Sequence, residues 1–101
     1  VLATNAGIYA ENRTPLGLHV ENKVELRPLN HHKGSESNFA LKPNGVFFLD
    51  VSGARMLTTE VYEAQQPAPV LAVQSGPMLV IGGAIHPKFK SESLSFHVRN
   101  G

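Results

Sequence analysis

The chain has 101 residues, 42% of them hydrophobic and 17% charged, so it can form one packed core but is too short for two domains. Nine Lys and Arg and eight Asp and Glu are scattered without runs, which argues against a nucleic-acid partner because phosphate binding needs a clustered basic face. The chain has no Cys, which excludes disulfides, thiolate nucleophiles and Cys-ligated metals. No apolar run approaches the roughly 20 residues of a membrane span.

Short apolar stretches separated by turn-forming residues predict three β-hairpins. Their strands are residues 16–20 and 23–27 around Glu21-Asn22, 46–51 and 54–57 around Ser52-Gly53, and 78–81 and 84–86 around Gly82-Gly83. Residues 70–73 are continuously apolar, which predicts an interior strand buried on both faces. Residues 94–98 alternate like a strand with one wet face. We expect Phe47 and Phe96 to be largely buried.

One short helix is predicted from Glu60 to about Gln66. Thr58 or Thr59 can cap its first turn, and Pro67 prevents its continuation. Residues 30–38 have no periodicity and are rich in polar residues, which indicates a surface loop. The expected fold is therefore α+β, a hairpin-rich mixed sheet with one short helix, forming an incomplete part of a larger α/β domain.

Three segments concentrate glycine and amide side chains: TNAG at 4–7, KPNG at 42–45 and QSGP at 74–77. Taken singly, each is more typical of a turn than of a binding site. The third ends an apolar strand and places Gln74 and Ser75 beside Gly76, where the backbone can approach a ligand closely. Strand-end loops of this kind often carry binding groups.

Familiar catalytic patterns are not found in these segments. Ser75 lacks the flanking glycines of a nucleophile elbow, since Val73 and Pro77 occupy those positions. No pair of His has zincin spacing, so we predict neither a metal nor a cofactor. Paired carboxylates are a common acid–base arrangement in hydrolases, but none of the eight acids lies in the three segments. The catalytic residues are therefore not identified.

Taken in order, seven segments resemble the bacterial branch of the phosphodiester glycosidase family, which is related in domain type to the enzyme that uncovers mannose 6-phosphate. The segments are NAGIY at 5–9, PLGL at 15–18, LRPLN at 26–30, KPNGVF at 42–47, QSGPMLV at 74–80, HPKF at 86–89 and RNG at 99–101. The resemblance covers nearly the whole chain as one partial domain, residues 1–101. An Asp-Gly-Gly type segment of the family is missing from it.

The resemblance implies hydrolysis of a sugar-1-phosphodiester at its glycosidic bond, with the isolated chain inactive. It also implies substrate contacts from the matching loops and the arginine segment. These residues are Asn5, Gly7, Asn44, Gln74, Ser75, Gly76, Arg99 and Asn100. An Arg suits a phosphodiester because its planar donors can bridge two phosphate oxygens. We expect Asn5, Gln74, Ser75 and Arg99 to converge on one concave surface.

Two other functions remain open from the sequence. One is a carbohydrate or cell-wall polymer binding module without catalysis, and the other is a β-rich assembly piece whose open edges pair with another chain. The expected partner is a sugar phosphodiester, and a second chain that completes the sheet is the alternative partner. The sequence does not fix the compartment; the family resemblance favours the periplasm or the extracellular space.

Overall fold

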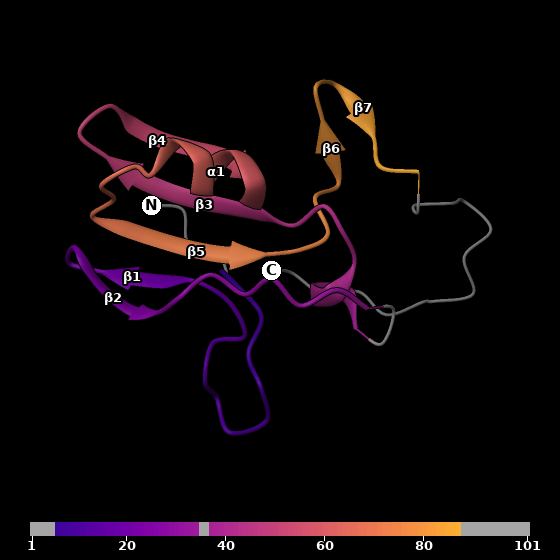
Figure 1. The fold of residues 1–101 in the computed structure, drawn as a ribbon, viewed down its shortest axis with the longest axis horizontal. Helices are drawn as coiled ribbons and strands as arrows, with labels where there is room; N and C mark the ends of the chain where they lie inside the picture. Colours follow the sequence, from indigo (N-terminus) through magenta and orange to yellow (C-terminus); the bar gives the residue numbers. More distant parts are fainter. Residues whose placement is uncertain (1–5, 35–36, 88–101) are drawn as a thin grey trace, which may run out of the picture.

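A computed structural model describes residues 6–34 and 37–87, arranged as a five-stranded antiparallel sheet with a helix on one face (Figure 1). The elements are β1 (His19–Glu21), β2 (Val24–Arg27), the 3-10 helix η1 (Asn38–Ala40), β3 (Gly45–Asp50), β4 (Gly53–Thr58), α1 (Thr59–Gln65), β5 (Leu71–Ser75), β6 (Val80–Ile81) and β7 (Ala84–Ile85). The main sheet has the order β2-β1-β5-β3-β4, and β6 pairs with β7. The predicted α+β class is confirmed. The expected strand at 94–98, including Phe96, lies outside the described residues.

All three predicted hairpins are present, and two of their turns differ by one position from the prediction. In the first, Asn22 and Lys23 form the turn with φ of 51° and 66°, because Asn tolerates the left-handed region that tight hairpin turns need. In the second, Val51 and Ser52 lie between the paired residues Asp50 and Gly53. The third turn is Gly82-Gly83, as predicted.

The helix α1 begins and ends almost where the sequence predicts. Its N-cap is Thr58, whose hydroxyl accepts a hydrogen bond from the Val61 N–H at 3.3 Å. This bond satisfies one of the donors that a helix start leaves unpaired. At the other end Gln66 adopts a left-handed conformation with φ of 45°, and Pro67 follows. Local chemistry therefore sets both ends of the helix.

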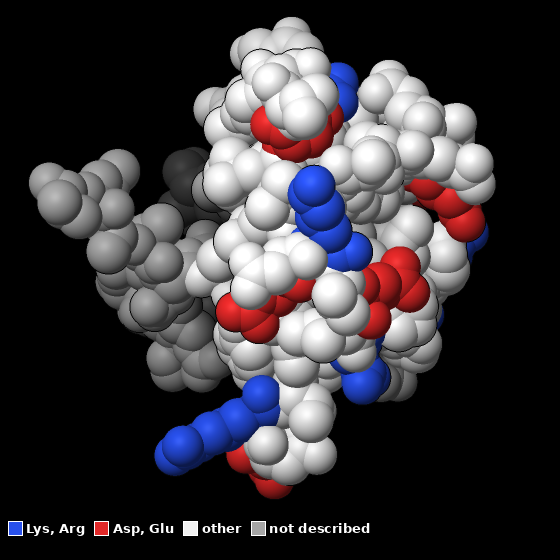
Figure 2. Space-filling model, turned by 90° about the vertical axis from the view of Figure 1, so that its left-hand side faces the viewer, with Lys and Arg blue, Asp and Glu red and all other residues white. Residues whose placement is uncertain are grey.

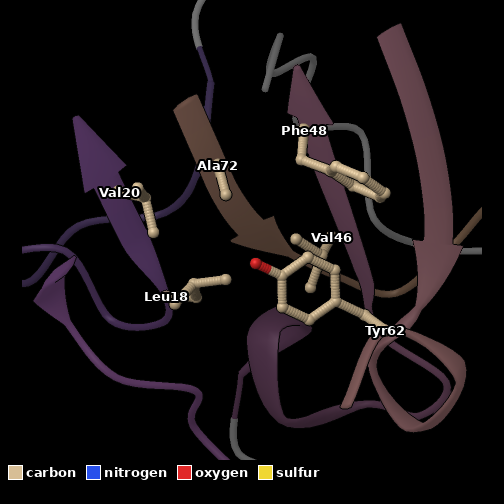
Figure 3. Close-up of a cluster of buried hydrophobic side chains, with 6 residues drawn as sticks. All are labelled: Leu18, Val20, Val46, Phe48, Tyr62 and Ala72. Carbon is tan, nitrogen blue, oxygen red and sulfur yellow. The ribbon is translucent and has the colours of Figure 1, made fainter. Parts of the chain in front are cut away.

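The core lies between the sheet and α1 (Figure 3). Its buried members are Leu18, Val20, Val46, Phe48, Tyr62 and Ala72. The rings of Phe48 and Tyr62 meet edge to face with centroids 5.2 Å apart, a favoured aromatic geometry. The Arg55 guanidinium lies 4.8 Å from the centroid of the Phe48 ring, so Phe48 is held from two sides.

The burial expected on both faces of residues 70–73 is wrong. The strand β5 is interior in the sheet, between β1 and β3, but Leu71 is 36% exposed while Ala72 is fully buried. Phe47 is also 36% exposed, against the expectation that it is largely buried, and its neighbour Phe48 is fully buried instead. Side chains alternate across a strand, and the described residues cover only the face that carries Phe48 and Ala72.

Charged side chains gather at the periphery of the sheet. At the end that carries the first two hairpin turns, acidic and basic side chains are interspersed (Figure 2). Arg55 pairs there with Asp50, whose carboxylate also accepts the Ser52 N–H at 2.8 Å. These contacts hold the pKa of Asp50 below its ordinary value, the Arg55 hydrogen bond being the main cause. None of the helices in the described part has the length and apolar character to cross a membrane.

We expect Phe48→Ala to lower the free energy of unfolding by about 3–5 kcal/mol, because it opens a cavity in a packed core. Phe47→Ala is the matched control, since its ring is partly in water, and its effect should be clearly smaller. Urea unfolding followed by circular dichroism measures both. Equal losses for the two variants would show that the core does not lie on the face assigned here.

Asp50 should make stability fall at acid pH. A carboxyl whose folded pKa is lowered adds stability above its unfolded pKa of about 4, and that contribution is lost as the pH falls through the lowered value. Replacing Asp50 by Asn should therefore flatten the decline in unfolding free energy below about pH 4. Urea unfolding at a series of pH values measures this, and an unchanged decline in Asp50→Asn would contradict it.

Candidate functional site

The described parts of the three glycine-containing segments meet at one end of the main sheet. The start of β3 pairs with the end of β5 through Gly45 and Ser75, and the Met78 N–H donates to the Pro43 carbonyl at 2.9 Å. The backbone of Gly7 lies beside the same strand end, where an added Cβ would be 3.8 Å from the Gln74 carbonyl oxygen. Residues thirty or more positions apart in sequence are therefore neighbours in space.

A cavity of about 480 Å³ opens at this meeting point. Its lining residues are Ala6, Gly7, Gly45, Phe47, Met56, Val73, Ser75, Gly76, Pro77, Met78, Leu79 and Val80. Among the described residues, Ser75 is the single lining residue with a polar side chain. All of the lining except Met56 and Val73 comes from segments that carry the family resemblance. The cavity is therefore the candidate site.

Gln74 lies next to the cavity, but its side chain points into the protein. Its exposure is 2%. Its Oε1 accepts the N–H groups of Leu18 at 3.0 Å and Asn30 at 2.9 Å. Its Nε2 donates to the Asn30 carbonyl at 2.9 Å and to the Thr59 hydroxyl at 3.3 Å. The amide is fully engaged in joining these three segments.

The expectation that Gln74 and Ser75 share one concave surface is wrong. Successive residues of a strand point to opposite faces of its sheet. Gln74 follows Ala72 on the core face, and Ser75 follows Val73 on the face that carries the cavity. Asn5, Arg99 and Asn100 lie outside the described residues, so their predicted contacts with substrate stay predictions.

Asn44 is fully buried behind the cavity. Its Nδ2 donates to the Phe39 carbonyl, and its Oδ1 accepts from the Lys42 ammonium. Gly76 packs against it so closely that an added Cβ would lie 2.8 Å from the Asn44 Cβ. Asn44 and Gly76 therefore fix the cavity wall together, and only Gly76 lines the cavity itself.

Two further residues near this wall were not selected from the sequence. His86 was expected only to end a strand in solvent, but it is 7% exposed, and its Nε2 lies 2.9 Å from the Lys42 carbonyl oxygen. Burial lowers the pKa of Lys42, with the Glu60 charge acting against this shift. Lys42 and His86 both lie in segments that resemble the family. This resemblance was the sequence signal that could have pointed to them.

A second hollow of about 610 Å³ lies on the core side, between the first hairpin and α1. Tyr62 and Val20 contribute to its walls, and Glu25 and Glu63 also line it. Only residue 29 of its lining belongs to the segments that carry the resemblance. This hollow is therefore the weaker candidate. Within residues 6–34 and 37–87, no three His, Asp or Glu residues gather in a way that could hold a metal ion.

Gln74→Leu should destabilise the fold by about 2–5 kcal/mol, since each buried polar group left without a partner costs about 1–3 kcal/mol. Gln65→Leu, at an exposed position of α1, is the matched control and should change the unfolding free energy by less than about 0.5 kcal/mol. Thermal and urea unfolding compare them. A Gln74→Leu protein as stable as the control would show that the amide does not join the segments.

The phosphodiester glycosidase family model matches residues 1–101. The Escherichia coli (strain K12) protein YigE is 37% identical over 100 residues, which are 99% of this chain and 39% of YigE. No solved structure matches the chain. With its whole length matched, the chain belongs to the phosphodiester glycosidase family.

Proposed function

We propose that this chain is part of a hydrolase that cleaves the glycosidic bond of a sugar-1-phosphodiester, and that the cavity beside Ser75 forms one wall of its substrate site. Family membership supports the reaction class. The location is supported by one observation: separate segments of the family pattern meet around a single cavity. A fold alone does not define a function, so the lining of the site carries this argument.

The cavity wall has groups suited to a sugar phosphodiester. The Ser75 hydroxyl can donate to a phosphate oxygen or exchange a hydrogen bond with a sugar hydroxyl. Gly7 and Gly76 leave room for a ligand to approach the backbone. Phe47 and Met78 supply apolar surface for the C–H face of a sugar ring. Binding sites commonly combine apolar walls with a few placed polar groups in this way.

Residues outside the described part complete the proposed site. Arg99 is proposed to bind the phosphodiester through its planar pair of donors, with Asn100 and Asn5 binding sugar hydroxyls. Gln74 and Asn44 act as positioning residues, because their amides are engaged within the protein. Their role is to hold the strand end and the loop from which the cavity wall is built.

The catalytic acids are proposed to come from polypeptide beyond this chain. Glycosidic cleavage ordinarily uses two carboxylates, one as acid and one as nucleophile or base. No Asp or Glu belongs to the lining of the cavity in the described residues. The chain spans 39% of the length of YigE, so a protein of that length has further residues to supply them. The 101-residue chain alone should then be inactive.

The same observation favours a second candidate function, a carbohydrate or cell-wall polymer binding module without catalysis. A cavity lined by apolar groups, glycines and one hydroxyl can bind a sugar without a carboxylate. The two functions differ in turnover by the complete protein, and binding alone does not separate them.

The test is a Ser75→Ala substitution in the full-length protein that contains this chain, assayed with a panel of sugar-1-phosphodiesters. Loss of one hydrogen bond in the transition state should lower kcat/KM about 10-fold. Ser52→Ala, in the exposed turn between β3 and β4, is the matched control and should keep full activity.

Three results would change this conclusion. Equal kcat/KM for Ser75→Ala and Ser52→Ala would remove the cavity from the site. Sugar binding without turnover by the full-length protein would establish the binding module instead. Turnover by the purified 101-residue chain, above a heat-denatured control, would show that the acids lie within it.

A further inference from the structure

The second hollow, between the first hairpin and α1, contains a polar group that the fold leaves without a partner. Tyr62 lines this hollow and is only 7% exposed. Figure 3 shows its oxygen directed away from Phe48, toward the β1 side of the core. No hydrogen bond joins this hydroxyl to any residue in the described part of the chain. A buried Tyr hydroxyl usually has a hydrogen-bond partner, so the partner of this one is to be sought in the hollow.

Solvent reaches the Tyr62 hydroxyl through the hollow. Every fully buried side-chain nitrogen or oxygen in the described residues has a hydrogen-bond partner, so an oxygen without one is not sealed from water. Burial raises the pKa of Tyr62, and the Glu25 charge acts in the same direction. The hydroxyl therefore keeps its proton at neutral pH, and it can donate a hydrogen bond to a ligand as well as accept one.

The rim of the hollow mixes hydrogen-bond acceptors and donors. Glu25 comes from β2 and Glu63 from α1, so a carboxylate is supplied by each of the two elements that flank the hollow. Lys23 adds an ammonium group, and Gln66 adds an amide that both donates and accepts. All four residues are exposed, so their side chains can turn toward a ligand without a buried charge being left unpaired.

These charges select the kind of ligand. A cation would be repelled by Lys23, and an anion would be repelled by Glu25 and Glu63. A neutral ligand with several hydroxyls can use every group on the rim, because each hydroxyl both donates and accepts. Pro67 and Pro69 supply apolar wall for the C–H face of a sugar ring. The volume of about 610 Å³ lies within the range of about 300–1,000 Å³ that small-molecule sites have.

We propose that the second hollow is a carbohydrate-binding site for a neutral sugar unit of a glycan, with the Tyr62 hydroxyl as its buried hydrogen-bonding group. The hollow lies on the core side of the sheet, and the cavity beside Ser75 lies on the other side. A protein with both sites can therefore hold a glycan in the hollow while a sugar phosphodiester occupies the cavity. The proposal is independent of the proposed enzymatic activity, since the lining of the hollow alone supports it.

Isothermal titration calorimetry on the full-length protein that contains this chain tests the proposal. The neutral probes are maltose, cellobiose and N,N′-diacetylchitobiose, and the charged comparisons are chitobiose, a cation, and cellobiouronic acid, an anion. Tyr62→Phe removes only the unpartnered hydroxyl, so it should weaken binding of a neutral disaccharide about 5- to 10-fold, as expected for one lost hydrogen bond. Tyr9→Phe is the matched control, because Tyr9 is the other Tyr of the chain and lines neither hollow nor cavity. It should bind like the unaltered protein.

Ser75→Ala distinguishes this site from the cavity. Neutral-sugar binding that Ser75→Ala weakens and Tyr62→Phe leaves unchanged would place the sugar in the cavity, which would overturn the present proposal and leave the proposed function standing. Failure of the proposed function would appear separately, as sugar-1-phosphodiester turnover that does not depend on Ser75.

Three other results would also contradict a neutral-sugar site in the hollow. They are equal affinities for Tyr62→Phe and Tyr9→Phe, tighter binding of a charged probe than of every neutral one, and no binding of any neutral disaccharide at millimolar concentration. If Tyr62→Phe does not fold, Ala68→Trp replaces it, because Ala68 is an exposed loop residue that lines the hollow. The indole should fill the hollow and abolish neutral-disaccharide binding, and unchanged binding would show that the hollow is not the site.

Discussion

The side-chain amide of Gln74 is the interaction on which the arrangement of this fold depends. It joins the segment leading into β1, the loop after β2 and the first residue of α1 through Leu18, Asn30 and Thr59. Buried polar groups are costly unless they are paired, so each of these segments has one favoured position. Gly17 is part of the same arrangement, since a Cβ there would lie 2.5 Å from the Gln74 Oε1.

Because side chains alternate across each strand, the residues that stabilise the fold and the residues that line the cavity lie on opposite faces of the sheet. Because Gln74 points into the core, Ser75 must point to the opposite face, where the cavity lies. The aromatic core of Phe48 and Tyr62 is likewise on the far side of the sheet from Phe47. The residues that hold the fold together and those that line the candidate site therefore alternate along the same two strands.

Charge follows the same division. The pairs Asp50–Arg55 and His31–Glu63 lie at the rim of the fold, while the part of the cavity lining that the structure describes has no charged side chain. Glycosidic chemistry ordinarily uses two carboxylates, and the described part of the cavity lining supplies none.

The sequence by itself determined the local elements of this protein, because their causes are local. Turn residues predicted the three hairpins to within one position, and Thr58 and Pro67 fixed the ends of α1. The segments that resemble the family, taken in chain order, indicated which loops form the candidate site. Only the tertiary structure decided which face of the sheet each side chain occupies. The sequence does not distinguish the adjacent residues Phe47 and Phe48, and it is the strand register that buries Phe48 and leaves Phe47 partly exposed. It also decided that the glycine segments meet and that Gln74 binds the protein, because both depend on pairing between strands distant in sequence.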